Sequence, residues 1–163
     1  MAIGSMGQPS VVQRQTIAEL HYKDSCKFAT AGEDLTSGYT ESHANKTITK
    51  NATGAVTIDG GTLALNDRIL VKDQTDTKEN GIYTVTTLGS GAAALVLTRA
   101  TDFDNSSECV SGGVYFVIVS AGSTQAHKSA FIGVGTESTT TTFGTTTFSV
   151  TASGAASEIT VAD

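Results

Sequence analysis

The chain has 163 residues and a formal net charge of −6 at neutral pH. That length fits about one domain, and the ten basic residues form no cluster that would bind nucleic acid or an anionic membrane. No apolar run approaches the roughly 20 residues of a membrane-spanning helix, and no signal-peptide pattern begins the chain. We therefore expect a protein made in the cytoplasm, with no nucleic-acid partner and no membrane insertion.

Thr, Ser, Gly and Ala dominate the composition, as in a β-protein with many turns. Residues 1–20 are predicted to form an arm outside the domain, and residues 1–6 resemble either a cloning remnant or a natural flexible start. From Pro9 onward the arm weakly fits one apolar helical face, and an extended arm fits nearly as well. Its apolar side chains need a partner, so we expect docking on a neighbouring subunit through Val12, Ile17 and Leu20.

The first half of the domain alternates short strands with polar loops. Residues 21–30 are predicted to be the first strand, and residues 55–58 a short strand that ends at a glycine-containing turn. Between them, residues 31–53 predict either a surface loop or an extra hairpin around 46–50. The β module as a whole is predicted to span residues 21–152, followed by a C-terminal tail at 153–163.

Residues 67–87 predict a hairpin. Apolar residues alternate along 67–72, with Ile69 and Val71 on one face, and the following loop ends in Asn80 and Gly81, a pair that tolerates positive φ and can close a reversal. Residues 82–87 are β-branched or aromatic, which suits a returning strand. With a further strand at 95–99, the pattern predicts a three-stranded meander.

The run from 114 to 119 is the most apolar predicted strand, because both of its parities are apolar. Such a strand is expected to be buried on both faces, by the core on one side and by a neighbouring protomer on the other. We assign the assembly contact to Tyr115, Val117 and Val119. Later strands are predicted at 131–134 and 148–150.

The hairpin residues also carry a family resemblance. Residues 67–74 (DRILVKDQ), 79–85 (ENGIYTV) and 97–104 (LTRATDFD) together resemble a module common in bacteriophage and prophage tail-fibre-like virion proteins. The resemblance extends over about residues 24–150, and the 31–53 stretch is longer than the family pattern. It implies a non-enzymatic virion structural protein of the tail-fibre, tail-tip or head-decoration kind. It also implies other virion proteins as partners and a homo-oligomer, with a trimer as the first expectation by analogy.

No motif for catalysis, cofactor binding or metal ligation stands out. The three histidines lack metal-ligand spacing, and the acidic runs at 73–79 and 102–108 lack the pattern of a calcium loop. No nucleophile or phosphate-loop motif occurs. Arg68 and Arg99 are instead predicted to pin strand ends by pairing with a carboxylate, and the residues given structural roles are Arg68, Arg99, Asp102, Asp104, Asn80 and Gly81.

Cys26 and Cys109 can form a disulfide or remain two buried thiols, and a cytosol-made protein favours the thiols. The expected fold is all-β, an antiparallel β-sandwich or partly closed barrel of about eight to ten short strands. The alternative function is a carbohydrate-binding host-attachment module that uses the 31–53 loop and the exposed tyrosines among Tyr39, Tyr83 and Tyr115. A glycan-degrading enzyme ranks third.

Overall fold

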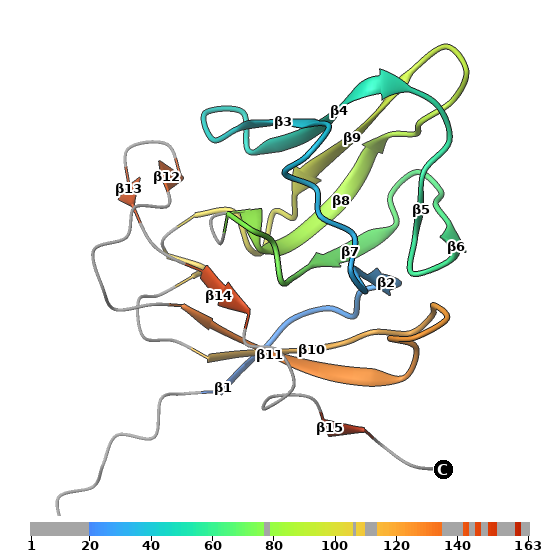
Figure 1. The fold of residues 1–163 in the computed structure, drawn as a ribbon. Coiled ribbons are helices and arrows are strands. Elements are labelled where there is room, and N and C mark those ends of the chain that lie inside the picture. The colour runs from blue at the N-terminus through green and yellow to red at the C-terminus, as the bar shows by residue number, and fades with distance from the viewer. Residues whose placement is uncertain are drawn as a thin grey trace, which may run out of the picture.

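The computed structural model describes residues 20–76, 79–105, 107–109 and 114–134, together with short strands between residues 142 and 160. This part of the chain is all-β and folds as a sandwich of two main sheets, with the smaller sheet below the larger one in Figure 1. It contains no helix long and apolar enough to cross a membrane. Residues 1–19, which hold most of the predicted arm, lie outside the described residues.

The larger sheet has six strands in the order β2-β7-β8-β9-β4-β3. Its bounds are β2 Phe28–Ala29, β3 Tyr39–Ser42, β4 Thr47–Thr53, β7 Arg68–Val71, β8 Gly81–Thr87 and β9 Ala94–Arg99. The predicted hairpin and meander are confirmed, because β7 pairs antiparallel with β8, and β8 with β9. The 31–53 stretch forms the extra hairpin, β3–β4, which lengthens the sheet through β9.

The smaller sheet runs β1-β10-β11-β14, and β15 pairs with another part of β11. Its bounds are β1 Leu20–Tyr22, β10 Val114–Ile118, β11 Lys128–Val134, β14 Val150–Ala152 and β15 Ile159–Thr160. The predicted strands at 114–119 and 131–134 are thus present, and the last one lies slightly later than predicted. The C-terminal stretch also contributes β15, a strand that the sequence did not predict.

Two short hairpins complete the described chain. β5 (Thr57–Ile58) pairs with β6 (Gly61–Thr62), and β12 (Thr142–Phe143) pairs with β13 (Thr146–Thr147). The β5–β6 turn has positive φ at Asp59 (47°) and Gly60 (71°), a conformation that these two residue types tolerate in tight hairpins.

The prediction of a single strand at 21–30 is wrong. This stretch divides into β1, which pairs parallel with β10, and β2, which pairs parallel with β7, so it crosses from one sheet to the other. The crossing occurs at exposed Asp24 and Ser25, and Cys26 then bridges to Val119. The sandwich therefore contains two parallel pairs among its antiparallel ones.

The core consists of two clusters on opposite faces of the larger sheet. One lies between the two sheets and includes Leu70 and Ile82 from the larger sheet with Val117 from the smaller one. The other includes Ile69 and Val71 and is covered by the β5–β6 hairpin and by loop residues. The prediction that β7 has one apolar face is thus too simple, because its consecutive residues 69–71 are all fully buried.

Candidate interaction surface

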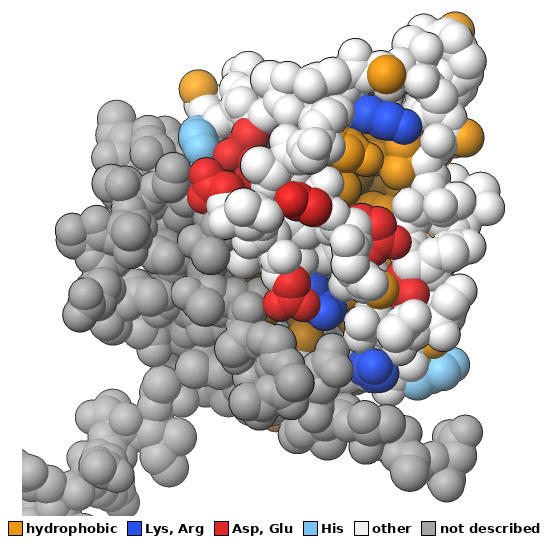
Figure 2. All heavy atoms as spheres, viewed as in Figure 1, with side chains coloured by type: hydrophobic (Ala, Val, Ile, Leu, Met, Phe, Trp, Pro, Cys, Tyr) orange, Lys and Arg blue, Asp and Glu red, His pale blue; other side chains and the backbone are white. Residues whose placement is uncertain are grey.

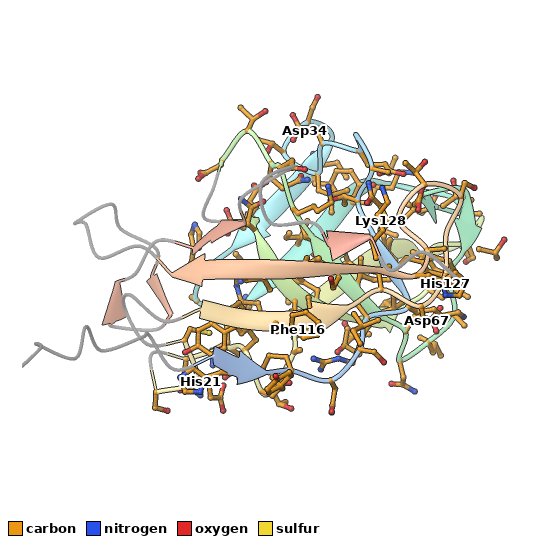
Figure 3. All side chains as sticks on the ribbon, turned by 90° about the horizontal axis from the view of Figure 1, so that it is seen from below. His21, Asp34, Asp67, Phe116, His127 and Lys128 are labelled. Carbon is orange, nitrogen blue, oxygen red and sulfur yellow. The ribbon has the colours of Figure 1, made fainter. Side chains whose placement is uncertain are left out.

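The outward face of the smaller sheet carries an apolar strip formed by Tyr22 of β1 and by Phe116 and Ile118 of β10. Tyr22 and Ile118 are 74% and 48% exposed, and Phe116 is half-buried. Tyr22 and Phe116 are opposite each other in the parallel pair, and their rings meet edge to face with centroids 5.6 Å apart. Figure 3 looks onto this face, with β1, β10 and β11 nearest the viewer and Phe116 labelled on β10.

Strand alternation explains why these residues share a face. Successive residues of a strand point to opposite sides, so positions 116 and 118 lie opposite 115, 117 and 119. The His21 ring stacks on the Tyr115 ring, with centroids 5.1 Å apart. The Lys23 amine lies 5.1 Å from the centroid of the same Tyr115 ring. None of the three residues of this strip, Tyr22, Phe116 and Ile118, is charged.

Tyr115, Val117 and Val119, the predicted assembly residues of this strand, face the core. Their exposure is 2%, 0% and 2%, and all three belong to the cluster between the two sheets. A contact made through the outward face of β10 would instead use Phe116 and Ile118, which lie on the opposite side of the strand. The sequence does not indicate which side of β10 faces the core, because the residues of both parities are apolar.

The three predicted arm residues cannot be placed as side chains. Val12 and Ile17 lie outside the described residues, and Leu20 is described only as the first residue of β1. Its backbone position is paired with Val114 at the start of β10. The predicted arm therefore leads directly into the edge strand that carries Tyr22.

One predicted arginine–carboxylate pair is present. The Arg68 guanidinium binds the Asp102 carboxylate in a bidentate manner, with Nη1 to Oδ1 at 3.0 Å and Nη2 to Oδ2 at 3.1 Å. Asp104 pairs with a different base, the Lys46 amine, at 3.1 Å. The two pairs tie the acidic turn after β9 to β7 and to the residue before β4.

Arg99 is almost fully buried, and its described contacts differ from those predicted. Its Nη1 donates a 3.0 Å hydrogen bond to the Asn80 carbonyl, and its guanidinium lies 4.7 Å from the Tyr83 ring centroid. Gly81 has φ of 143°, and a Cβ atom there would collide with the Arg99 guanidinium. Asn80 also accepts a 3.0 Å hydrogen bond from the Gln74 amide through Oδ1, so this turn and Arg99 form one structural unit.

Acidic residues are spread over the face seen in Figure 2, which is viewed as in Figure 1. Two acidic residues of the described chain have identified partners: Glu79 accepts a 2.7 Å hydrogen bond from the Thr36 hydroxyl, and Asp73 pairs with Lys72. His43 lies 2.9 Å from the Glu41 carboxylate. Within the described residues, no three His, Cys, Asp or Glu side chains are grouped so as to hold a metal ion, and no pocket is found.

The tyrosines proposed for sugar stacking are mostly inaccessible. Tyr83 and Tyr115 are buried, and Tyr39 on the edge strand β3 is half-buried. Tyr22 is instead the exposed tyrosine among the described residues, and no role was predicted for it. The signal that could have found it is its place in a short alternating stretch next to the apolar arm.

No protein-family model matches the chain, and no curated protein or solved structure matches it significantly. What the fold and the surface define is an all-β sandwich whose smaller sheet exposes apolar side chains on its outward face.

Proposed function

We propose that this chain is a non-enzymatic structural protein of a bacteriophage particle, of the tail-fibre, tail-tip or head-decoration kind. It would be made in the host cytoplasm, form homo-oligomers and bind other virion proteins. The observation that carries this proposal is the outward apolar strip of Tyr22, Phe116 and Ile118 on a sheet whose other face is packed in the core. Exposed apolar side chains gathered on one rigid face are typical of a protein–protein contact.

Two further features support an assembly role. The resemblance of residues 67–104 to the tail-fibre-like module falls on the central meander, which is the best-buried part of the larger sheet. The meander is also linked to the 101–108 turn by the Arg68–Asp102 pair. A scaffold with such internal ties keeps its outer surfaces in fixed positions, which repeated assembly requires.

A carbohydrate-binding host-attachment module is the second candidate, and exposed Tyr22 is the observation that favours it. An exposed aromatic ring can stack on a sugar, and Tyr39 on the β3 edge could add a second ring. Glycan-array binding that is lost in Tyr22→Ala, with no incorporation into particles, would favour this candidate over the virion role.

The direct test is to purify phage particles from the source of the chain and to look for the protein in them. We expect a fixed copy number per particle by quantitative mass spectrometry and labelling of one particle region by antibody in electron microscopy. Particles formed without the gene should lack that region. A protein that never co-purifies with particles through a density gradient would contradict the proposal.

A further inference from the structure

We propose that Glu79 is a pH-sensitive latch for the edge hairpin β3–β4, which is held in place when the Glu79 carboxyl is protonated and released when the carboxyl ionises. The latch acts on residues 33–36, a segment that we call the strap because it is bonded along the 72–80 loop just before β3. β3 is the last strand of the larger sheet (Figure 1). The inference goes beyond the proposed function and does not depend on it, because it concerns contacts within a single chain.

Gln74 clamps the strap to the loop. Gln74 is almost fully buried, its Oε1 accepts a 2.5 Å hydrogen bond from the Leu35 amide, and its Nε2 donates a 2.9 Å bond to the Glu33 carbonyl. Next to it, the Thr75 hydroxyl donates a 2.9 Å bond to the Asp34 carboxylate. Leu35 itself is buried in the core cluster on this face of the larger sheet. Opening the strap breaks several of these contacts together, so it occurs as one local step.

Glu79 is buried where the strap ends. The residue is 4% exposed, its Oε2 accepts a 2.7 Å hydrogen bond from the Thr36 hydroxyl, and its backbone carbonyl accepts a 2.8 Å bond from the Tyr83 hydroxyl. A protonated carboxyl tolerates such a position, whereas an ionised carboxylate loses most of its hydration there. The cost of ionising Glu79 is therefore relieved when the strap lifts and water reaches the carboxylate.

β3 brings a second carboxyl to the same place. Glu41 is the register partner of Ile48, which is fully buried in the cluster that contains Tyr83. Since register partners share a face of the sheet, Glu41 points to the face on which Glu79 is held. The Glu41 carboxyl hydrogen-bonds to Glu79 and lies 2.9 Å from the His43 imidazole. Glu79 thus joins the strap and β3, so a change in its charge acts on both.

The charges around Glu79 oppose its ionisation. Asp34 of the strap and Asp76 of the 72–80 loop both disfavour a further negative charge. On the positive side, the Arg99 guanidinium of β9 acts on Tyr83 and donates a 3.0 Å hydrogen bond to the carbonyl that follows Glu79 in the chain. An ionised Glu79 therefore repels the strap through Asp34.

These contacts make the strap sensitive to pH. Burial, together with the charges of Asp76 and Asp34, raises the pKa of Glu79 above its ordinary value of 4.5, although the hydrogen bonds from Thr36 and Glu41 lower it in part. In the open strap the carboxyl is hydrated and has its ordinary pKa. The closed strap thus binds the proton more tightly, so opening becomes more favourable as the pH rises from 4.5 through the folded value, and then levels off.

The first experiment follows hydrogen exchange of the Leu35 amide, which the Gln74 side chain protects, by NMR on the full chain. After correction for the intrinsic exchange rate, the opening constant should rise severalfold between pH 4.5 and neutral pH. The Val119 amide, bonded to the Lys128 carbonyl in the smaller sheet, is the internal reference. An opening constant that does not change with pH, or an equal rise at Val119, would overturn the inference.

Glu79→Gln tests whether this carboxyl is the sensor. The amide cannot ionise and can still accept the Thr36 bond, so the Leu35 opening constant should stay at every pH near the low value of the wild type in acid. Asp73→Asn is the matched control, because it removes a charge from the same loop at an exposed residue paired with Lys72. The control should keep the wild-type pH dependence. Loss of the dependence in both variants would mean that net charge, and not Glu79, sets the opening.

A second measurement reads the carboxyl itself in the wild type, so it needs no variant to fold. The side-chain carboxyl signal of Glu79 should titrate with a midpoint above pH 4.5, and the Leu35 opening constant should level off near that midpoint. Thr36→Val should move the midpoint upward, because the Thr36 hydroxyl favours the ionised form. A midpoint at or below 4.5, or a titration of Glu79 that leaves Leu35 exchange unchanged, would show that Glu79 is no latch.

Discussion

The Asp59 carboxylate accepts a hydrogen bond from the Gln125 backbone amide at 2.7 Å, although the two residues are 66 positions apart. It also accepts bonds from the Thr124 amide at 2.9 and 3.0 Å, and the Asp59 carbonyl accepts one from the Ser123 amide at 2.9 Å. One residue of the β5–β6 turn thus holds the loop between β10 and β11. Asp59 thereby connects the β5–β6 hairpin, which covers one face of the larger sheet, to the loop that leads into β11 of the smaller sheet.

Replacing Asp59 by Asn should therefore destabilise the whole sandwich. The amide side chain has one acceptor oxygen and no charge, and hydrogen bonds to a charged acceptor contribute about 1.5–3 kcal/mol. We expect a loss of about 1–3 kcal/mol in the free energy of unfolding, measured by urea denaturation.

Asp73→Asn is the matched control, because Asp73 also has positive φ but lies on the surface, paired with Lys72. A surface pair of this kind contributes at most about 1 kcal/mol. Equal losses for the two variants would show that Asp59 is not a special link between the layers.

The same carboxylate predicts a loss of stability in acid. Burial raises the pKa of Asp59, but the hydrogen bonds from the Gln125 and Thr124 amides outweigh it and hold the pKa below its ordinary value of 3.8. A depressed pKa in the folded state contributes stability above the ordinary value, and this stability is lost as the pH falls through the folded value. The difference in unfolding free energy between wild type and Asp59→Asn should thus shrink below pH 3.8. A difference that stays constant with pH would contradict this account.

Glu79 should have the opposite dependence on pH. Burial raises its pKa, the Thr36 hydroxyl lowers it, and the charges of Asp76 and Asp34 raise it further; the net pKa lies above the ordinary value of 4.5. Its contribution to stability is therefore most favourable below pH 4.5 and declines as the pH rises through the folded value. Glu79→Gln removes this ionisation and can keep the Thr36 hydrogen bond. We expect Glu79→Gln to have a larger free energy of unfolding than the wild type at neutral pH, as measured by urea denaturation.

The control for Glu79→Gln is Asp24→Asn, which removes one negative charge at an exposed position. This control measures how much stability is gained simply because one negative charge is removed from a chain of net charge −6, whose negative charges repel one another. If both variants gain the same stability at every pH, the gain comes from net charge and not from the buried position of Glu79.

Local patterns in the sequence were enough to predict the central meander. The apolar residues of β7, the turn residues Asn80 and Gly81 and the β-branched residues of β8 all lie within about twenty residues. That Arg68 pairs with a carboxylate was also predicted, and the structure shows Asp102 as its partner, in the turn that follows β9. Strand existence and turn chemistry are local properties, so a single sequence reveals them.

The features that depend on distant partners could not be predicted in this way. The crossing between β1 and β2 is set by pairing with β10 and β7, which lie far along the chain. The partners of Asp59 are equally remote. The inward side of β10 is decided by Tyr115 packing on Phe103 and His21, whereas its own sequence is apolar on both parities. The interaction strip therefore became visible only in the folded structure.

The two cysteine thiols should be unreactive in the folded protein. Burial raises the pKa of Cys26 and of Cys109 to about 12, and the nearby charges of Arg68 and Lys23 lower these values only in part. Since the thiolate is the reactive species, both side chains should resist a disulfide reagent at neutral pH and react fully in urea. Above the ordinary pKa of 9.0 the unfolded chain ionises first, so stability should fall as the pH rises toward 12. The exposed thiol of Tyr22→Cys provides the positive control, and rapid labelling of either native cysteine in the folded protein would show that the core between the sheets opens.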